Sequence, residues 1–228
     1  MGRLYIDLFT TLDLVAQAPG GPDEDPSGGF PFGGWQAPFP DEVVGEQVGA
    51  GIAAMDALLL GRRTYDIFAA YWPQHETGPD GEIGAKFAEI PKYVASRGTP
   101  ELTWRGSTLL GPDLPAQVRV LRERHENIHV IGSIDLVQTL LAGNLFDVLT
   151  LWVHPVVLGQ GKKVFPDGAT PSALSLLEPP VTGSTGVVSL RYGPTGFAPT
   201  TGDMTQPDRG VRSDVSSARE VRRTRSPT

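Results

Sequence analysis

Three short stretches of the sequence carry residues suited to binding an anion. Gly61-Arg62-Arg63-Thr64 follows the apolar run LLL, Ser96-Arg97 follows YVA, and Gly132-Ser133 follows HVI. A helix start offers unpaired backbone N–H groups, glycine lets a phosphate come close to them, and arginine adds charge-assisted bonds. One such junction alone is better explained as a tight turn with solvated arginines. The three together favour a site for a phosphorylated ligand.

The elements before and after these junctions indicate how they come together. Short apolar runs alternate with helical patterns, which predicts an α/β layer fold with a largely parallel sheet. Strands are expected at residues 4–12, 57–60, 93–96, 128–131, 148–158, 174–177 and 187–192, and helices at 41–55, 64–72, 114–123 and around 134–141. The last three strands have only Gly- and Pro-rich connections between them, so an antiparallel end is expected. Ligands of open α/β sheets bind outside the carboxyl ends of strands, where the three junctions would meet.

Four blocks of sequence carry a resemblance to a known family. The stretch MDALLLGRRTYDIFAAYWP at 55–73 resembles the signature of the dihydrofolate-reductase-like superfamily, in its branch related to the bacterial reductase domain of riboflavin biosynthesis. KYVASR, IHVIGSIDLVQTLL and LWVHPVVLGQGKKVF are similar to later blocks of that family, in the same order. The resemblance spans residues 3–192. It implies a three-layer fold, with an eight-stranded, mostly parallel sheet that ends antiparallel and holds NADPH across its strand ends.

The resemblance also implies roles for the junction residues. Gly61, Arg62, Arg63 and Thr64 match the segment that holds cofactor phosphates. Ser96 and Arg97 match the pair near the adenosine ribose, where a cationic, hydroxyl-bearing pocket would favour NADPH over NADH. The turn of Gly132, Ser133 and Ile134 matches the one over the pyrophosphate and the nicotinamide, although Ile134 is bulkier than the family's usual residue.

Acidic residues on the substrate side are harder to assign. Asp13 lies in Thr11-Leu12-Asp13-Leu14, which resembles the S-L-D-G end of the family's first strand. It could orient substrate or water, or it could be an ordinary turn residue. Glu46 is the acid nearest in spacing to the helix carboxylate of dihydrofolate reductases, but an ordinary exposed helix residue is the better explanation. Asp13 and Glu46 are the catalytic candidates, and dihydrofolate is not favoured as the substrate.

Two loops could contact the substrate. Residues 19–34 contain six glycines and four prolines and end beside Trp35, so they predict either a mobile lid with aromatic side chains or a disordered insertion. Val157 and Gly159, in the segment 155–165, could approach the substrate through backbone groups. Trp35, Val157 and Gly159 are therefore the substrate-binding candidates.

Composition removes several classes of function. The chain has 228 residues, a formal net charge of −7 and no cysteine, which argues against nucleic-acid binding and excludes thiolate chemistry. The four histidines are scattered, so no metal site is expected. No long apolar run or secretory signal is present, which predicts a cytoplasmic protein that does not bind membranes. Residues 1–198 are expected to form one domain and 199–228 a disordered tail.

These observations predict an NADPH-dependent reductase that transfers a hydride to a small planar heterocyclic or ribityl-type substrate. The first alternative is a protein that binds a nucleotide or small molecule on the same fold without turnover. The second is a structural homodimer in which the late strands form an interface. The sequence leaves both open.

Overall fold

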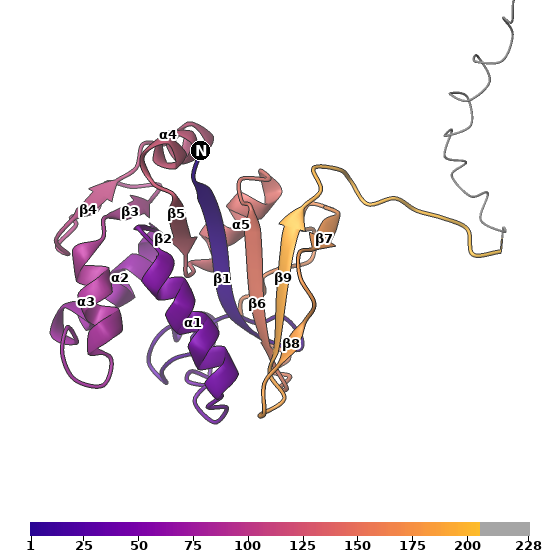
Figure 1. Ribbon diagram of the computed structural model, residues 1–228, viewed down its shortest axis with the longest axis horizontal. Coiled ribbons are helices and arrows are strands. Elements are labelled where there is room, and N and C mark those ends of the chain that lie inside the picture. Colours follow the sequence, from indigo (N-terminus) through magenta and orange to yellow (C-terminus); the bar gives the residue numbers. More distant parts are fainter. Residues whose placement is uncertain (206–228) are drawn as a thin grey trace, which may run out of the picture.

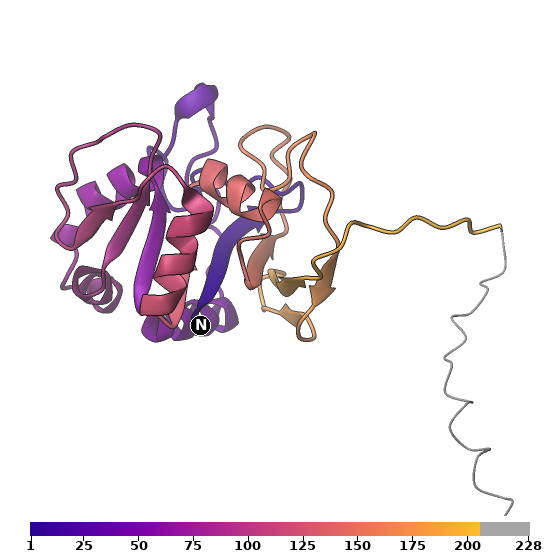
Figure 2. The same ribbon diagram turned by 90° about the horizontal axis from the view of Figure 1, so that it is seen from above.

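The computed structural model describes residues 1–205, and the predicted tail at 199–228 lies mostly outside that range. A sheet of nine strands runs through the domain, with helices on both of its faces (Figures 1 and 2). Within residues 1–205, none of the helices is both long and apolar enough to span a bilayer.

The sheet has the mixed topology that the sequence predicts. Its strands are β1 (Arg3–Thr11), β2 (Ala57–Gly61), β3 (Lys92–Ala95), β4 (Ser107–Leu109), β5 (Asn127–Val130), β6 (Val148–His154), β7 (Leu174–Leu176), β8 (Val181–Thr182) and β9 (Val188–Pro194). Their order is β4-β3-β2-β5-β1-β6-β9-β7, and β8 pairs with β9. The strands from β4 to β6 are parallel, whereas β9 is antiparallel to β6, β7 and β8. The parallel sheet with an antiparallel end is therefore confirmed.

Helices cover the two faces of the sheet in separate groups. They are α1 (Glu42–Ala54), α2 (Arg62–Tyr71), α3 (Gly81–Glu89), α4 (Leu114–Arg124) and α5 (Ile134–Ala142), with short 3-10 turns η1 (Ser27–Gly29) and η2 (Trp72–Gln74). One buried cluster joins β1 and β5 to α4 and α5, and another joins β2 and β3 to α2 and α3. The central strand β2 is buried along its whole length, because both faces are covered.

Side chains alternate along β1 and so reach both layers. Leu4, Ile6 and Leu8 belong to the core under α4 and α5. Asp7 and Phe9 therefore face the opposite layer, where Phe9 packs with Val44 of α1. This alternation brings a carboxylate to the α1 side of the sheet.

Several element boundaries differ from the sequence predictions. The sheet has nine strands rather than eight, and the sequence did not indicate β4, β8 or α3. β4 has only three residues at the sheet edge, and α3 contains two glycines, so neither gives a strong pattern. β6 ends at His154 instead of 158, because Pro155 cannot donate to the ladder.

Lys92 on β3 is an unusual fully buried cation. Its Nζ donates to the carbonyl oxygens of Phe87 (2.6 Å) and Ile90 (3.0 Å), at the end of α3, and lies 4.4 Å from the ring centroid of Trp104. Burial, with the nearby positive charge of Arg105, lowers the pKa of Lys92 to about 8. The layer that packs against β2 and β3 therefore contains a buried lysine that gains or loses its proton near pH 8.

Candidate functional site

A large cavity lies at the carboxyl ends of the parallel strands. Its volume is about 1260 Å³. It is lined by every residue that the sequence analysis assigned to the cofactor: Gly61, Arg62, Arg63, Thr64, Ser96, Arg97, Gly132, Ser133 and Ile134. The expected convergence of the three junctions is therefore present in the structure.

Two of the junctions are in direct contact with each other. A Cβ atom on Gly61 would stand 2.2 Å from Oγ of Ser133, and one on Gly132 would stand 3.1 Å from Oγ1 of Thr64. Gly132 also has a φ of +75°, and the backbone N–H of Thr64 donates to Oγ of Ser133 (3.3 Å). The glycines thus let the N-terminal ends of α2 and α5 meet, with both ends at one cavity wall.

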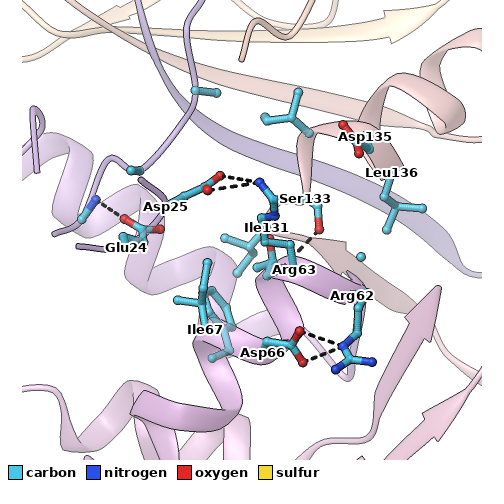
Figure 3. Close-up of a pocket in the computed structure, with 18 of the residues that line it drawn as sticks. Glu24, Asp25, Arg62, Arg63, Asp66, Ile67, Ile131, Ser133, Asp135 and Leu136 are labelled. Carbon is cyan, nitrogen blue, oxygen red and sulfur yellow. Dashed lines mark hydrogen bonds and ion pairs between the residues drawn. The ribbon is translucent and has the colours of Figure 1, made fainter. Parts of the chain in front are cut away.

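The arginines of this wall differ in their partners. Nε of Arg62 lies 2.7 Å from both carboxylate oxygens of Asp66, one turn further along α2. Arg63 instead points across the cavity to Asp25, with Nη1 3.2 Å from Oδ1 (Figure 3). Arg97 is exposed and has no ion pair among residues 1–205. Only one of the three arginines is therefore uncompensated.

Asp25 also forms an ion pair with a second cation, which comes from another loop. Its Oδ2 lies 2.6 Å from Nζ of Lys162, which also donates to Oγ of Ser27 (2.9 Å). Burial raises the pKa of Asp25, but the hydrogen bonds from Lys162 and Ser27 and the charge of Lys162 outweigh it, so the pKa is lower than usual. Asp25 is therefore an ionised partner of two basic side chains.

The lining carries more acids than bases. Seven acidic residues border the cavity, namely Asp7, Asp23, Glu24, Asp25, Asp66, Asp80 and Asp135, against the four bases Arg62, Arg63, Arg97 and Lys162. The sequence suggested a cationic pocket from its arginines alone. The acids come from β1, the 19–29 segment and several helices. Most of them lie outside the three junctions, so the junction residues alone could not indicate them.

The cavity continues into an apolar compartment between α1, α2 and α3. Its lining there comes from Val48, Ile52, Ile67, Phe68, Trp72, Ile83 and Phe87. Asp7 is also part of the lining, and its Oδ2 lies 2.6 Å from Nδ1 of His129 on β5. The ring of His129 stacks on Tyr5 with centroids 4.7 Å apart. The histidine that binds the Asp7 carboxylate is therefore itself fixed in position by a neighbouring ring. The sequence analysis did not single out either residue for this role.

Neither expected catalytic acid lines the cavity. Asp13 accepts hydrogen bonds from Oγ1 of Thr11 (2.6 Å) and from the backbone N–H groups of Leu158 (3.2 Å) and Gly159 (2.8 Å). Burial raises the pKa of Asp13, but these hydrogen bonds together outweigh it, so the pKa is lower than usual. Glu46 is exposed on α1. Asp13 thus fixes the connection after β6, and the catalytic role of both residues stays a prediction.

The three substrate-binding candidates also lie outside the lining. Trp35 is buried in a small cluster with Phe30, and its Nε1 donates to the carbonyl oxygen of Gln17 (2.8 Å). Val157 is 65% exposed, and Gly159 donates to Asp13. Of the predicted lid, residues 19–25 border the cavity, while its aromatic side chains Phe30 and Trp35 pack inward.

Comparisons with known proteins agree with this fold. The chain is 28% identical over 197 residues to the uncharacterized protein YyaP of Bacillus subtilis, covering 83% of this chain and 94% of that one. A putative riboflavin biosynthesis protein from Shewanella superposes with a TM-score of 0.64 at 18% identity, covering 84% of this chain and 98% of that one.

A more distant structure shares the same fold. Dihydrofolate reductase from Enterococcus faecalis, solved in complex with NADP(H), superposes with a TM-score of 0.51 at 14% identity, covering 85% of this chain and 97% of that one. The sequence model of the RibD C-terminal domain matches residues 3–185, which is most of the described chain. The protein therefore belongs to the RibD C-terminal domain family.

Proposed function

We propose that the protein is an NADPH-dependent reductase of a small planar heterocyclic or ribityl-type substrate. The observation that carries this proposal is one cavity with two different ends. One end is formed by two adjoining helix N-termini, and the other is an apolar compartment with a carboxylate in its wall. Pockets for small molecules typically measure about 300–1,000 Å³, so a cavity of about 1260 Å³ is large enough for a substrate beside part of a cofactor.

The residues at the polar end fit a dinucleotide phosphate. The first turns of α2 and α5 present backbone N–H groups and the positive ends of two helix dipoles. Ser96 and the unpaired Arg97 would lie near the adenosine ribose and favour the additional phosphate of NADPH. When bound, the nicotinamide supplies the hydride.

At the other end, the chain's own residues would position the substrate. The apolar side chains of α1, α2 and α3 exclude water from a flat ring. Asp7 would accept a hydrogen bond from a ring N–H group or exchange a proton with the ring, since His129 fixes its orientation. This assignment gives Asp7 the role that the sequence analysis considered for Glu46.

The proposal is tested by titrating the protein with NADPH and NADH separately. NADPH should bind at least about tenfold more tightly, because one charge-assisted bond contributes roughly 1.5–3 kcal/mol. The loss of nicotinamide absorbance is then followed with a panel of pterins, flavins and aminopyrimidine ribosides. Equal affinity for the two cofactors, or no binding of either, would contradict the proposal.

A non-catalytic binding protein is the second candidate, and the placement of the acids favours it. Neither Asp13 nor Glu46, the two catalytic acids expected from the sequence, borders the cavity, so proton transfer there would need another acid of the lining, such as Asp7. NADPH binding without oxidation on any member of the panel would support this second function.

A further inference from the structure

A cluster of opposite charges stands at the cavity wall beside α2. Asp25 lies between Arg63 and Lys162, at 3.2 Å and 2.6 Å, and Ser27 contacts both cations. The Asp25 side chain is only 12% exposed, whereas Arg63 is 52% and Lys162 31% exposed. The carboxylate is therefore the inner member of the cluster, and the cations reach it from the solvent side.

Two loops far apart in the sequence bring these groups together. Nε2 of Gln17 donates to the carbonyl oxygens of Asp25 and Ser27, both at 2.9 Å, while its Oε1 accepts from the backbone N–H of Lys162 (3.0 Å). Gly161 permits the approach, since a Cβ there would stand 2.8 Å from the ring of Phe30. The geometry of the cluster is thus built into the fold and does not depend on long side chains alone.

Two cations and a hydroxyl group are the donors that proteins use to bind a phosphate. Arg63 is also the second residue of α2, where the helix dipole favours negative charge. Here these donors are already directed at a carboxylate of the same chain. A phosphate that approaches Arg63 must therefore compete with Asp25 (Figure 3).

We propose that Asp25 is an internal competitor for the phosphate group of a ligand at Arg63, Lys162 and Ser27. A bound phosphate takes over the two cations, and Asp25 is released together with residues 19–25, while Gln17 keeps Ser27 at the site. This inference rests on the proposed function in so far as the phosphate belongs to a nucleotide cofactor or a phosphorylated substrate. It predicts that Asp25 lowers affinity, the opposite of what a supporting residue would do.

The direct test compares Asp25→Asn with the unaltered protein by calorimetric titration. Two probes are used, NADPH and inorganic pyrophosphate. Both should bind roughly tenfold more tightly to the variant, because the phosphate no longer displaces an ion-paired carboxylate. Asp23→Asn is the matched control, since Asp23 is exposed in the same segment and makes none of the contacts of Asp25. It removes the same charge and should change either affinity by less than about twofold.

The two probes separate this inference from the proposed function. Tighter pyrophosphate binding with no NADPH binding by either protein would support the competitor and contradict the reductase. Unchanged or weaker binding of pyrophosphate by Asp25→Asn would overturn the competitor, whatever NADPH does. An equal gain in affinity in Asp23→Asn would also overturn it, because the loss of any negative charge near the cavity would then have the same effect.

A measurement on the unaltered protein covers the case in which Asp25→Asn does not fold. Hydrogen exchange is followed with and without pyrophosphate, at a concentration that protects the amides at the start of α2. Amides of residues 19–25 should then exchange several times faster, because the hold of Arg63 and Lys162 on Asp25 is lost. Slower or unchanged exchange there, or no protection at α2, would overturn the proposal.

Discussion

The two walls of the cavity are built in different ways. The wall proposed to bind the cofactor, called the cofactor wall below, consists of the ends of β2, β3 and β5 with the first turns of α2 and α5. Each functional group in it lies within a few residues of a regular element. The opposite wall combines Asp7 of β1, residues 19–25 and Lys162, which are distant in sequence. The first wall is therefore set by local backbone geometry, and the second depends on how a long loop folds back on the domain.

The largest expected effect concerns the contact within the cofactor wall. Gly61→Ala places a Cβ 2.2 Å from Oγ and 2.7 Å from Cβ of Ser133, so the two helix ends must separate. We expect the dissociation constant for NADPH to rise by about a hundredfold or more, with a loss of roughly 1–3 kcal/mol in the free energy of unfolding.

Gly45→Ala is the control for this variant, because a Cβ there has open space on α1. It should leave cofactor binding unchanged and stabilise the helix by up to about 1 kcal/mol. Titration and denaturant unfolding of both variants measure these effects. Normal binding by Gly61→Ala would show that the two junctions are not mechanically joined.

The next effect should be confined to the opposite wall. Asp7→Asn keeps the shape of the side chain but removes its charge, and we expect turnover to fall about a hundredfold while the NADPH dissociation constant stays within about twofold. Glu46→Gln, on the exposed face of α1, should keep normal turnover. If Glu46→Gln were the more impaired variant, the original sequence expectation would be right and Asp7 would be structural.

A third prediction concerns Lys92, the buried cation on β3, the strand that leads into Ser96 and Arg97. Lys92 has a pKa of about 8 in the folded protein and about 10.4 when unfolded, so the native state binds fewer protons between these values. The free energy of unfolding should therefore rise with pH from about 8 to 10.4, by on the order of 2–3 kcal/mol, and this gain is lost as the pH falls back through 8.

Lys92→Met is the reference for that pH series, because it removes the titrating group while filling the same space. Denaturant unfolding at several pH values should show the rise in the unaltered protein and not in the variant. The same slope in both proteins would assign it to other groups.

The smallest effect is expected within the folded loop. Trp35→Phe removes the bond from Nε1 to the carbonyl oxygen of Gln17 and should reduce the free energy of unfolding by about 1–2 kcal/mol. Because Gln17 also ties Asp25 to Lys162, turnover should decrease more than NADPH affinity. An equal loss of both would mean that the two walls are not independent.

The same distinction explains how far the sequence could be interpreted. The strand ends, helix starts and junction glycines give short-range patterns, and all nine expected cofactor residues line the cavity. Asp7 was missed because one acid in an alternating strand resembles any solvated residue, and its partner His129 is 122 positions away. Trp35 was expected to meet substrate because composition shows that the loop is unusual, but not that its aromatic rings form a separate small core.

The contact between Gly61 and Ser133 also has an evolutionary consequence. The two positions share one small volume, so a larger residue at one is tolerated only if the other becomes smaller or its turn is rebuilt. Among homologues, the residues at these two positions should therefore vary together, although they are far apart in sequence. A protein that accepts alanine at the first position should have glycine at the second, and Ser133→Gly should accordingly rescue part of what Gly61→Ala loses.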